Sequence, residues 1–180
     1  MKDINESILC AGFGGQGIMV LGKFLANAGM KQGLNVTWLP SYGAEVRGGT
    51  ANVSVRISSD LIADPVISST DTAIIMNGAS LDKFEDRIVP GGFLILNTSI
   101  SDRRPGRKDI EVMEVPLTDE AISLGNIRVA NIIAAGIYAA KKKIFDKKLL
   151  INIIEEMSGS RKEIIPANIR AIEKGMSFVG

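Results

Sequence analysis

Histidine is absent from this chain of 180 residues, and cysteine occurs once, as Cys10. Because histidine is the commonest general base and the commonest zinc ligand, we do not expect self-contained hydrolysis or metal chemistry. A single cysteine forms no internal disulfide and supplies too few thiolates for an iron–sulfur cluster. We therefore assign the chain no catalytic acid or base and no metal site, and we expect Cys10 to be a core residue.

An excess of charge and a long apolar run are also missing. Lysine and arginine total 21 against 20 acids, and the weak net field does not favour nucleic acid as a partner. The most apolar segment, 129–140, includes Asn131 and is shorter than the roughly 20 residues that cross a bilayer. Residues 1–6 carry acids and lack the apolar stretch of a secretory signal. We therefore expect a cytoplasmic protein with no membrane partner.

The chain does contain enough apolar side chains for one core. Hydrophobic residues make up 46% of the sequence and charged residues 23%, which excludes a disordered chain. A length of 180 residues fits one domain, and no repeat or low-complexity linker divides it. We therefore expect residues 1–180 to form a single domain.

The periodicity of apolar residues predicts an alternation of strands and helices. The expected strands are 7–11, 35–39, 72–76, 93–97 and 110–115. The expected helices are 18–28, 79–87, 128–143, 150–157 after Asp146 as N-cap, and a last helix with Pro166 in its first turn. This order indicates the α/β class, with a doubly wound, mostly parallel, Rossmann-like sheet and C-terminal helices.

Two details of the chain order refine this fold. Strand 7–11, the helix after it and strand 35–39 predict a βαβ unit with a right-handed crossover. Apolar and polar residues alternate over 51–57, and residues 58–60 can turn the chain back toward 61–63. The second pattern predicts an inserted β-hairpin, which interrupts the regular alternation.

A glycine-rich segment, Gly12-Phe13-Gly14-Gly15-Gln16-Gly17, directly follows the first expected strand and opens the first expected helix. In this context the first glycine permits a tight turn, the second lets backbone N–H groups approach a phosphate, and the third lets helix and strand pack closely. The helix N-terminus adds partial positive charge. We therefore expect cofactor-binding residues at Gly12, Gly14, Gly15, Gln16 and Gly17, and the alternative is a tight turn without a ligand.

An ordinary NAD site is not expected in this loop. Such a site requires an acidic residue near the end of the second strand to bind the ribose. The chain has no acid there, because its sequence at this point is Leu39-Pro40-Ser41-Tyr42. The expected ligand is phosphate or pyrophosphate, bound directly or with the help of a partner chain.

A second polar segment, 41–50, leaves the sheet at the end of the second expected strand, where folds of this class place ligands. Arg47, beside two glycines, can present a bidentate fork to a phosphate or carboxylate. The alternative is that Glu45 and Arg47 pair with each other at a surface or subunit contact. The candidate residues that face a substrate or partner are Ser41, Tyr42, Glu45, Arg47, Gly48 and Gly49.

Two asparagines, Asn126 and Asn131, bracket the start of a highly apolar helix. Each can be a helix cap or a buried hydrogen-bond anchor. We favour these structural roles over a ligand contact.

Several of these segments together carry a resemblance to a known family. They are Gly12-x-Gly14-Gly15-Gln16-Gly17, Tyr42-Gly43-Ala44-Glu45-Val46-Arg47-Gly48-Gly49, Asn126…Asn131, and Asn168-x-x-Ala171-x-x-x-Gly175. In this combination the chain resembles, nearly end to end, the gamma subunit of 2-oxoacid:ferredoxin oxidoreductases. The pattern is closest to the 2-oxoglutarate or 2-oxoisovalerate members, and the pyruvate and indolepyruvate enzymes are the alternatives.

The resemblance implies oxidative decarboxylation of a 2-oxoacid with coenzyme A (CoA), which yields an acyl-CoA, carbon dioxide and reduced ferredoxin. It also implies that thiamine diphosphate and the iron–sulfur clusters belong to sister subunits, the alpha, beta and ferredoxin-like delta chains. The gamma chain then holds no cofactor alone and carries out no redox step. It supports the assembly and helps to form the crevice on the CoA or thiamine side.

Two rival functions share the same fold, and fold alone does not choose between them. One is a stand-alone nucleotide-binding protein, and the other is a structural scaffold subunit whose glycine loop makes protein contacts. When it is isolated from its partners, the chain is expected to form a homodimer through an apolar surface that sister subunits normally cover.

Overall fold

The computed structural model describes residues 3–41 and 50–180. Within them lies one six-stranded sheet with the strand order β2-β3-β1-β4-β5-β6. The strands are β1 (Asn5–Phe13), β2 (Asn35–Ser41), β3 (Thr50–Ser58), β4 (Thr70–Ile75), β5 (Ile88–Asn97) and β6 (Glu111–Val115). Strand β3 is antiparallel to both of its neighbours, whereas β1, β4, β5 and β6 pair in parallel. The α/β class with a mostly parallel sheet is thereby confirmed.

The predicted βαβ unit is wrong in one respect, because β1 and β2 are not neighbours. Strand β3 lies between them and pairs with both. Its side chains Val53, Val55 and Ile57 are fully buried on the face that meets α1. A central place in the sheet buries this apolar face, which an edge position would leave partly open to water.

The inserted antiparallel element has different arms from those predicted. Strand β3 covers the expected 51–57, but its hairpin partner is β2, and residues 61–63 form no strand. Leu61 is 89% exposed and buries almost nothing. The guanidinium of Arg56 donates to the carbonyl of Asp64 at 3.0 Å, which holds this segment as a loop.

In residues 3–41 and 50–180, six α-helices and three short 3₁₀ turns accompany the sheet. The helices are α1 (Ile18–Lys31), α2 (Gly78–Phe84), α3 (Leu117–Ser123), α4 (Ala130–Lys142), α5 (Lys147–Ser158) and α6 (Ile165–Ser177). The 3₁₀ turns are η1 (Glu85–Arg87), η2 (Ile127–Val129) and η3 (Lys162–Ile164). Two sequence signals for helix starts are confirmed: Asp146 caps α5 by accepting from the Leu149 N–H at 2.7 Å, and Pro166 lies in the first turn of α6.

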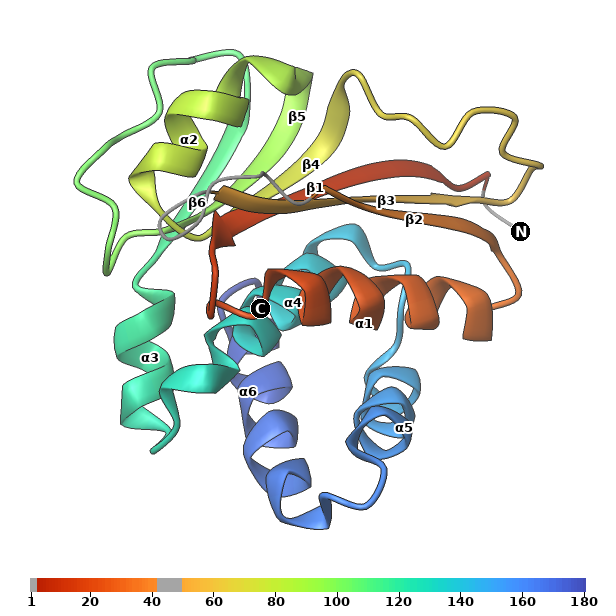
Figure 1. Cartoon of the computed structure of the whole chain (residues 1–180), viewed down its shortest axis with the longest axis vertical. Coiled ribbons are helices and arrows are strands. Elements are labelled where there is room, and N and C mark those ends of the chain that lie inside the picture. The colour runs from red at the N-terminus through yellow and green to blue at the C-terminus, as the bar shows by residue number, and fades with distance from the viewer. Residues whose placement is uncertain (1–2, 42–49) are drawn as a thin grey trace.

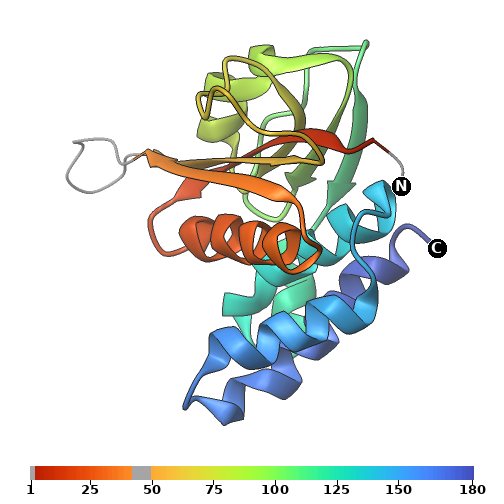
Figure 2. The same ribbon diagram turned by 90° about the vertical axis from the view of Figure 1, so that its right-hand side faces the viewer.

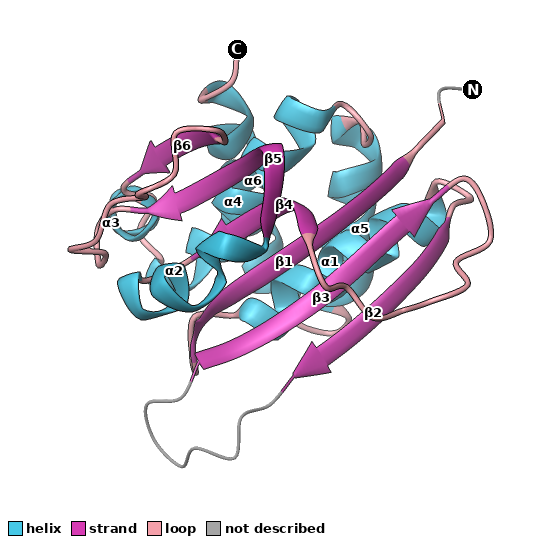
Figure 3. Cartoon of the chain, turned by 90° about the horizontal axis from the view of Figure 1, so that it is seen from above, coloured by secondary structure: helices cyan, strands magenta, loops and turns pink. Residues whose placement is uncertain are grey.

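The helices cover both faces of the sheet, as a doubly wound fold requires. Helix α2 lies on one face, and α1 and α4 lie against the other (Figures 1 and 2). Helices α5 and α6 pack on α1 and α4, farther from the sheet. Two separate apolar clusters fill these two interfaces. Seen from above, α2 lies over the strands, and α1 and α4 run beneath them (Figure 3). The sheet therefore lies between α2 on one side and α1 and α4 on the other.

Helices α4 and α6 approach each other unusually closely, and two glycines make this possible. A Cβ atom at Gly175 would lie 2.0 Å from the carbonyl oxygen of Ile133, and one at Gly136 would lie 2.4 Å from that of Ile172. Such distances leave no room for a side chain at either position. The contact fixes α6 against α4, whose central residues are buried.

No helix within the described part of the chain is long and apolar enough to span a membrane.

Candidate functional site

The glycine loop joins β1 to α1 and lies at the surface of the protein. Gly14 and Gly15 are exposed, and a Cβ at either position would meet nothing within 4 Å. Gly17 is the N-cap of α1 in the left-handed region, with φ 73° and ψ 25°, and no side chain caps this helix. Its first-turn N–H groups are therefore open to an anion, since a helix N-terminus leaves them without intrahelical partners.

The first and last glycines of the loop have a packing role. A Cβ at Gly12 would lie 2.5 Å from the side-chain oxygen of Gln16 and 2.9 Å from Cβ of Met76. At Gly17 the added atom would lie 2.4 Å from Nδ2 of Asn131. The roles expected for the glycines thus separate along the loop: its two ends pack closely, and its middle leaves open space.

The side chain of Gln16 turns inward and bonds to its own protein. Its Oε1 accepts from the N–H of Phe13 at 2.6 Å and from Nδ2 of Asn77 at 3.0 Å. Its Nε2 donates to the carbonyl of Met76 at 3.2 Å, and that carbonyl also accepts from Asn97. These bonds tie the glycine loop to the carboxyl ends of β4 and β5. A direct ligand contact by Gln16 stays a prediction.

A cavity of about 700 Å³ opens beside the loop, between α1, α4, α5 and α6. This volume lies within the range of roughly 300–1,000 Å³ that small-molecule sites occupy. Both apolar and polar side chains line it. The lining residues that matter below are Gly15, Gly17, Lys23, Trp38, Arg128 and Arg161.

The cavity is cationic, although the whole chain is nearly neutral. Lys23, Arg128 and Arg161 border it, and no aspartate or glutamate does so among the described residues. None of the three cations forms an ion pair with a described carboxylate. Three cations without an acidic partner in the described part of the chain therefore border one space together with an uncapped helix N-terminus. Such an arrangement favours binding of phosphate or carboxylate.

Three asparagines of the sequence pattern, Asn126, Asn131 and Asn168, meet at this cavity. Asn126 caps η2 by accepting from the N–H of Arg128 at 3.1 Å. Asn131 is buried and donates to the carbonyl of Gly17 at 3.0 Å. The expected structural roles of Asn126 and Asn131 are thus confirmed, and the same residues also place the cation Arg128 and the glycine loop.

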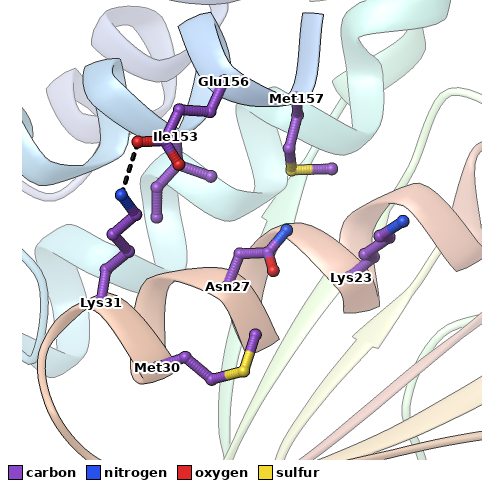
Figure 4. Close-up of a pocket in the computed structure, with 7 residues that line it drawn as sticks. All are labelled: Lys23, Asn27, Met30, Lys31, Ile153, Glu156 and Met157. Carbon is purple, nitrogen blue, oxygen red and sulfur yellow. Dashed lines mark hydrogen bonds and ion pairs between the residues drawn. The ribbon is translucent and has the colours of Figure 1, made fainter. Parts of the chain in front are cut away.

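A smaller groove of about 530 Å³ continues from the cavity between α1 and α5. Lys23 and Met157 border both spaces. Figure 4 shows Lys31 and Glu156 joined across the groove by an ion pair, with Asn27 and Met30 beside them. Because Glu156 neutralises the charge of Lys31, this groove carries less free positive charge than the main cavity.

Of the second polar segment, Ser41 lies within the described residues. It is exposed at the end of β2 and pairs with Asn52, which in turn pairs with Ala11 of β1. At about 4.8 Å between strands, Ser41 lies roughly 10 Å from the start of the glycine loop. Tyr42, Glu45, Arg47, Gly48 and Gly49 lie outside the described residues.

Sequence reasoning missed the three cations of the cavity. Lys23, Arg128 and Arg161 are exposed and lie on α1, at η2 and after α5, far apart in the chain. Solvated lysines and arginines are common, so no local pattern distinguishes these three. The described residues contain no group of three or more His, Cys, Asp or Glu side chains that could hold a metal ion.

The fold and the site define an α/β protein with a cationic cavity at the glycine loop of its first helix. The family model of pyruvate ferredoxin/flavodoxin oxidoreductase matches residues 7–178. The chain belongs to this family, and the resemblance found in the sequence is confirmed.

The chain is similar to several named proteins. It is 32% identical over 169 residues to the ketoisovalerate oxidoreductase subunit VorA of Methanothermobacter thermautotrophicus. This match covers 93% of this chain and 35% of VorA. The solved 2-oxoglutarate:ferredoxin oxidoreductase of Magnetococcus marinus, with 2-oxoglutarate, coenzyme A and succinyl-CoA bound, is 25% identical with a TM-score of 0.88. That match covers 99% of this chain and 31% of the other. The chain thus spans about a third of the length of these two relatives.

A third similar protein has nearly the same length as this chain. It is the gamma subunit of a keto/oxoacid ferredoxin oxidoreductase from Geobacter sulfurreducens, 23% identical with a TM-score of 0.83. The match covers 97% of this chain and 98% of that subunit. At 23% identity, this match shows that the two proteins share a fold.

Proposed function

We propose that the chain is the gamma-type, non-redox subunit of a 2-oxoacid:ferredoxin oxidoreductase. The proposed reaction is oxidative decarboxylation of a 2-oxoacid with CoA to an acyl-CoA, carbon dioxide and reduced ferredoxin. Family membership supports this role, as does the full-length fold match to a gamma subunit. The names of two relatives support 2-oxoisovalerate or 2-oxoglutarate as the substrate.

Within that complex, the contribution of this chain is a binding site for the phosphate groups of CoA. One observation carries this proposal: Lys23, Arg128 and Arg161 border the same cavity as the free N-terminus of α1, without a described acid among them. Each charge-assisted hydrogen bond to a phosphate contributes about 1.5–3 kcal/mol. The solved relative that has CoA bound supports CoA over other phosphates.

The chain's own residues do not fit the redox cofactors of such a complex. Its one cysteine, Cys10, is fully buried, and an iron–sulfur cluster needs several accessible thiolates. Thiamine diphosphate and the iron–sulfur clusters are therefore assigned to the alpha, beta and delta sister subunits, where they supply the carbanion and electron-transfer chemistry. The cytoplasm is the proposed location.

The task of this chain is then to bind and orient CoA, and no acid or base in it is assigned a catalytic step. The N–H groups of Gly14, Gly15 and Gly17 are proposed to bind a phosphate. In support, no side chain caps α1 at Gly17, and Asn131 donates to the carbonyl of Gly17. Gln16 supports the loop from behind. Arg47 is proposed to add charge from the second polar segment. The alternative is that Arg47 pairs with Glu45 at a surface or subunit contact.

Steady-state kinetics of the assembled complex test the proposal. Arg128→Ala and Arg161→Ala should each raise the KM for CoA by about 10- to 100-fold, the equivalent of one lost charged hydrogen bond, and leave the KM for the 2-oxoacid unchanged. Arg170→Ala, on an exposed arginine of α6 that does not border the cavity, is the matched control. An unchanged KM for CoA in both variants would overturn the proposed site.

Titration of the isolated chain separates the rival functions. Calorimetry with CoA, NAD and pyrophosphate should give binding of CoA and pyrophosphate but not of NAD. Tight NAD binding would instead support a stand-alone nucleotide-binding protein. Affinity for none of them, together with strong co-purification with sister subunits, would support a structural scaffold. The predicted homodimer of the isolated chain is checked by its mass in solution.

A further inference from the structure

Trp38 is the single tryptophan of the chain, and it borders the cationic cavity. It lies on β2, one of the two edge strands that the described residues form, and is 39% exposed. A Cβ at Gly22 would lie 3.2 Å from the indole Nε1, so the edge of the ring rests on α1 where that helix has no side chain. The indole is thereby held in place while part of it stays open.

The position of Trp38 relative to the anion site follows from α1. The helix begins after Gly17, where the N–H groups are free, and Trp38 contacts it at Gly22. Five residues along a helix correspond to roughly 7.5 Å. Lys23 lies next to Gly22 on the same helix and borders the same cavity. An anion site and an aromatic surface are thus separated by about the length of a ribose and its phosphates.

We propose that Trp38 is a stacking platform for the purine base of the ligand, so that the cavity binds an adenine nucleotide rather than phosphate alone. Stacking of a base on an aromatic side chain contributes about 1–3 kcal/mol. The inference rests on the proposed CoA site and deepens it, since it assigns the ADP portion of CoA to this cavity. A half-exposed indole costs little to leave open in solvent and gains a partner when the base enters.

The test measures four ligands on the full chain by calorimetry. They are CoA, ADP, inorganic pyrophosphate and 4′-phosphopantetheine, of which the first two carry adenine. Trp38→Leu should weaken CoA and ADP by about 10-fold, corresponding to about 1.4 kcal/mol, and leave pyrophosphate and 4′-phosphopantetheine unchanged. Trp38→Phe should recover most of the loss because phenylalanine keeps an aromatic face. In the unchanged protein, CoA and ADP should also quench the fluorescence of Trp38 more than pyrophosphate does.

Leu39→Ala is the matched control, because Leu39 is the next residue of β2, is similarly exposed, and does not border the cavity. An equal loss for all four ligands in Trp38→Leu would mean a purely structural role and overturn the platform. ADP binding no tighter than pyrophosphate in the unchanged protein would also overturn it, while leaving the phosphate site intact. If the unchanged protein binds none of the four, the phosphate site fails as well.

Discussion

The side-chain amide of Asn131 donates a hydrogen bond of 3.0 Å to the main-chain carbonyl of Gly17, across 114 positions of sequence. This bond joins the first turn of α4 to the N-cap of α1. The oxygen of the same side-chain amide, Oδ1, is buried and has no hydrogen-bond partner among the described residues. Because a buried polar atom without a partner costs free energy, the arrangement persists only where the surrounding packing enforces it. The geometry of the glycine loop therefore depends on α4.

Gly17→Ala should destabilise the protein by about 1–3 kcal/mol. The substitution places a β-carbon at φ 73°, where side chains are strained, and within 2.4 Å of Nδ2 of Asn131. Urea unfolding measures the change in the free energy of unfolding. Gly14→Ala is the control, since its added carbon meets nothing within 4 Å and its φ is not positive. Equal stability of the two variants would contradict the proposed strain.

A prediction about Gln16 decides between a supporting role and a ligand contact. Gln16→Leu removes the partners of the Phe13 N–H and of Asn77 and should lower the free energy of unfolding by about 1–3 kcal/mol. Affinity for pyrophosphate should fall with it, because the loop loses its scaffold. Gln32→Leu, at the exposed end of α1, should change neither quantity. If stability stays constant while affinity falls, Gln16 touches the ligand directly.

The close approach of α4 and α6 predicts a strong effect of Gly175→Ala. The added carbon would lie 2.0 Å from the carbonyl oxygen of Ile133, and backbone cannot yield as a flexible side chain does. We expect a loss of about 3 kcal/mol in the free energy of unfolding. Pyrophosphate affinity should fall too, since α6 carries Asn168 at the cavity. Gly106→Ala, whose nearest atom is 4.0 Å away, should leave the stability within about 0.5 kcal/mol of the unchanged protein.

Stability should fall at alkaline pH because of Cys10. Burial raises the pKa of its thiol well above the ordinary value of 9.0. The folded state therefore keeps the thiol proton at pH values at which the unfolded state loses it. The contribution of Cys10 to the free energy of unfolding is thus complete below the pKa of the unfolded thiol, about 8.5, and declines as pH rises above that value. The expected slope is about 1 kcal/mol per pH unit. Urea unfolding near pH 8 and near pH 10 measures it.

Cys10→Ala is the comparison for this slope, since it removes the ionising group. Its free energy of unfolding should change less between the two pH values than that of the unchanged protein. A residual slope is expected from Tyr138, whose pKa burial also raises. If the free energy of unfolding changes equally with pH in the two proteins, Cys10 does not cause the loss of stability at alkaline pH.

Much of the local structure follows from the sequence. The run 7–11 and the glycines after it predict β1, the loop and α1, because the strand, the turn and the helix N-terminus are each encoded within a few residues. Asp146 marks the start of α5 for the same reason. The family was also identified from segments of the sequence, and the family model matches residues 7–178.

The pairing of β3 could not be predicted from its own sequence. An alternating strand with one apolar face fits a hairpin as well as a place between β1 and β2. Its place between them goes with the packing of α1, which contacts β1, β2 and β3 together. Likewise, the inward turn of Gln16 depends on Asn77 and Met76, which lie about 60 residues later in the chain. Such contacts have no signature at short range.

The sequence by itself determined that a glycine loop opens a helix, that the chain has one cysteine and no histidine, and which family it resembles. Only the tertiary structure decided that Lys23, Arg128 and Arg161 share one cavity with that loop and with Trp38. The physical reason is that backbone conformation is set by neighbours in the chain, whereas a binding site needs charges and surfaces that folding brings together from distant segments.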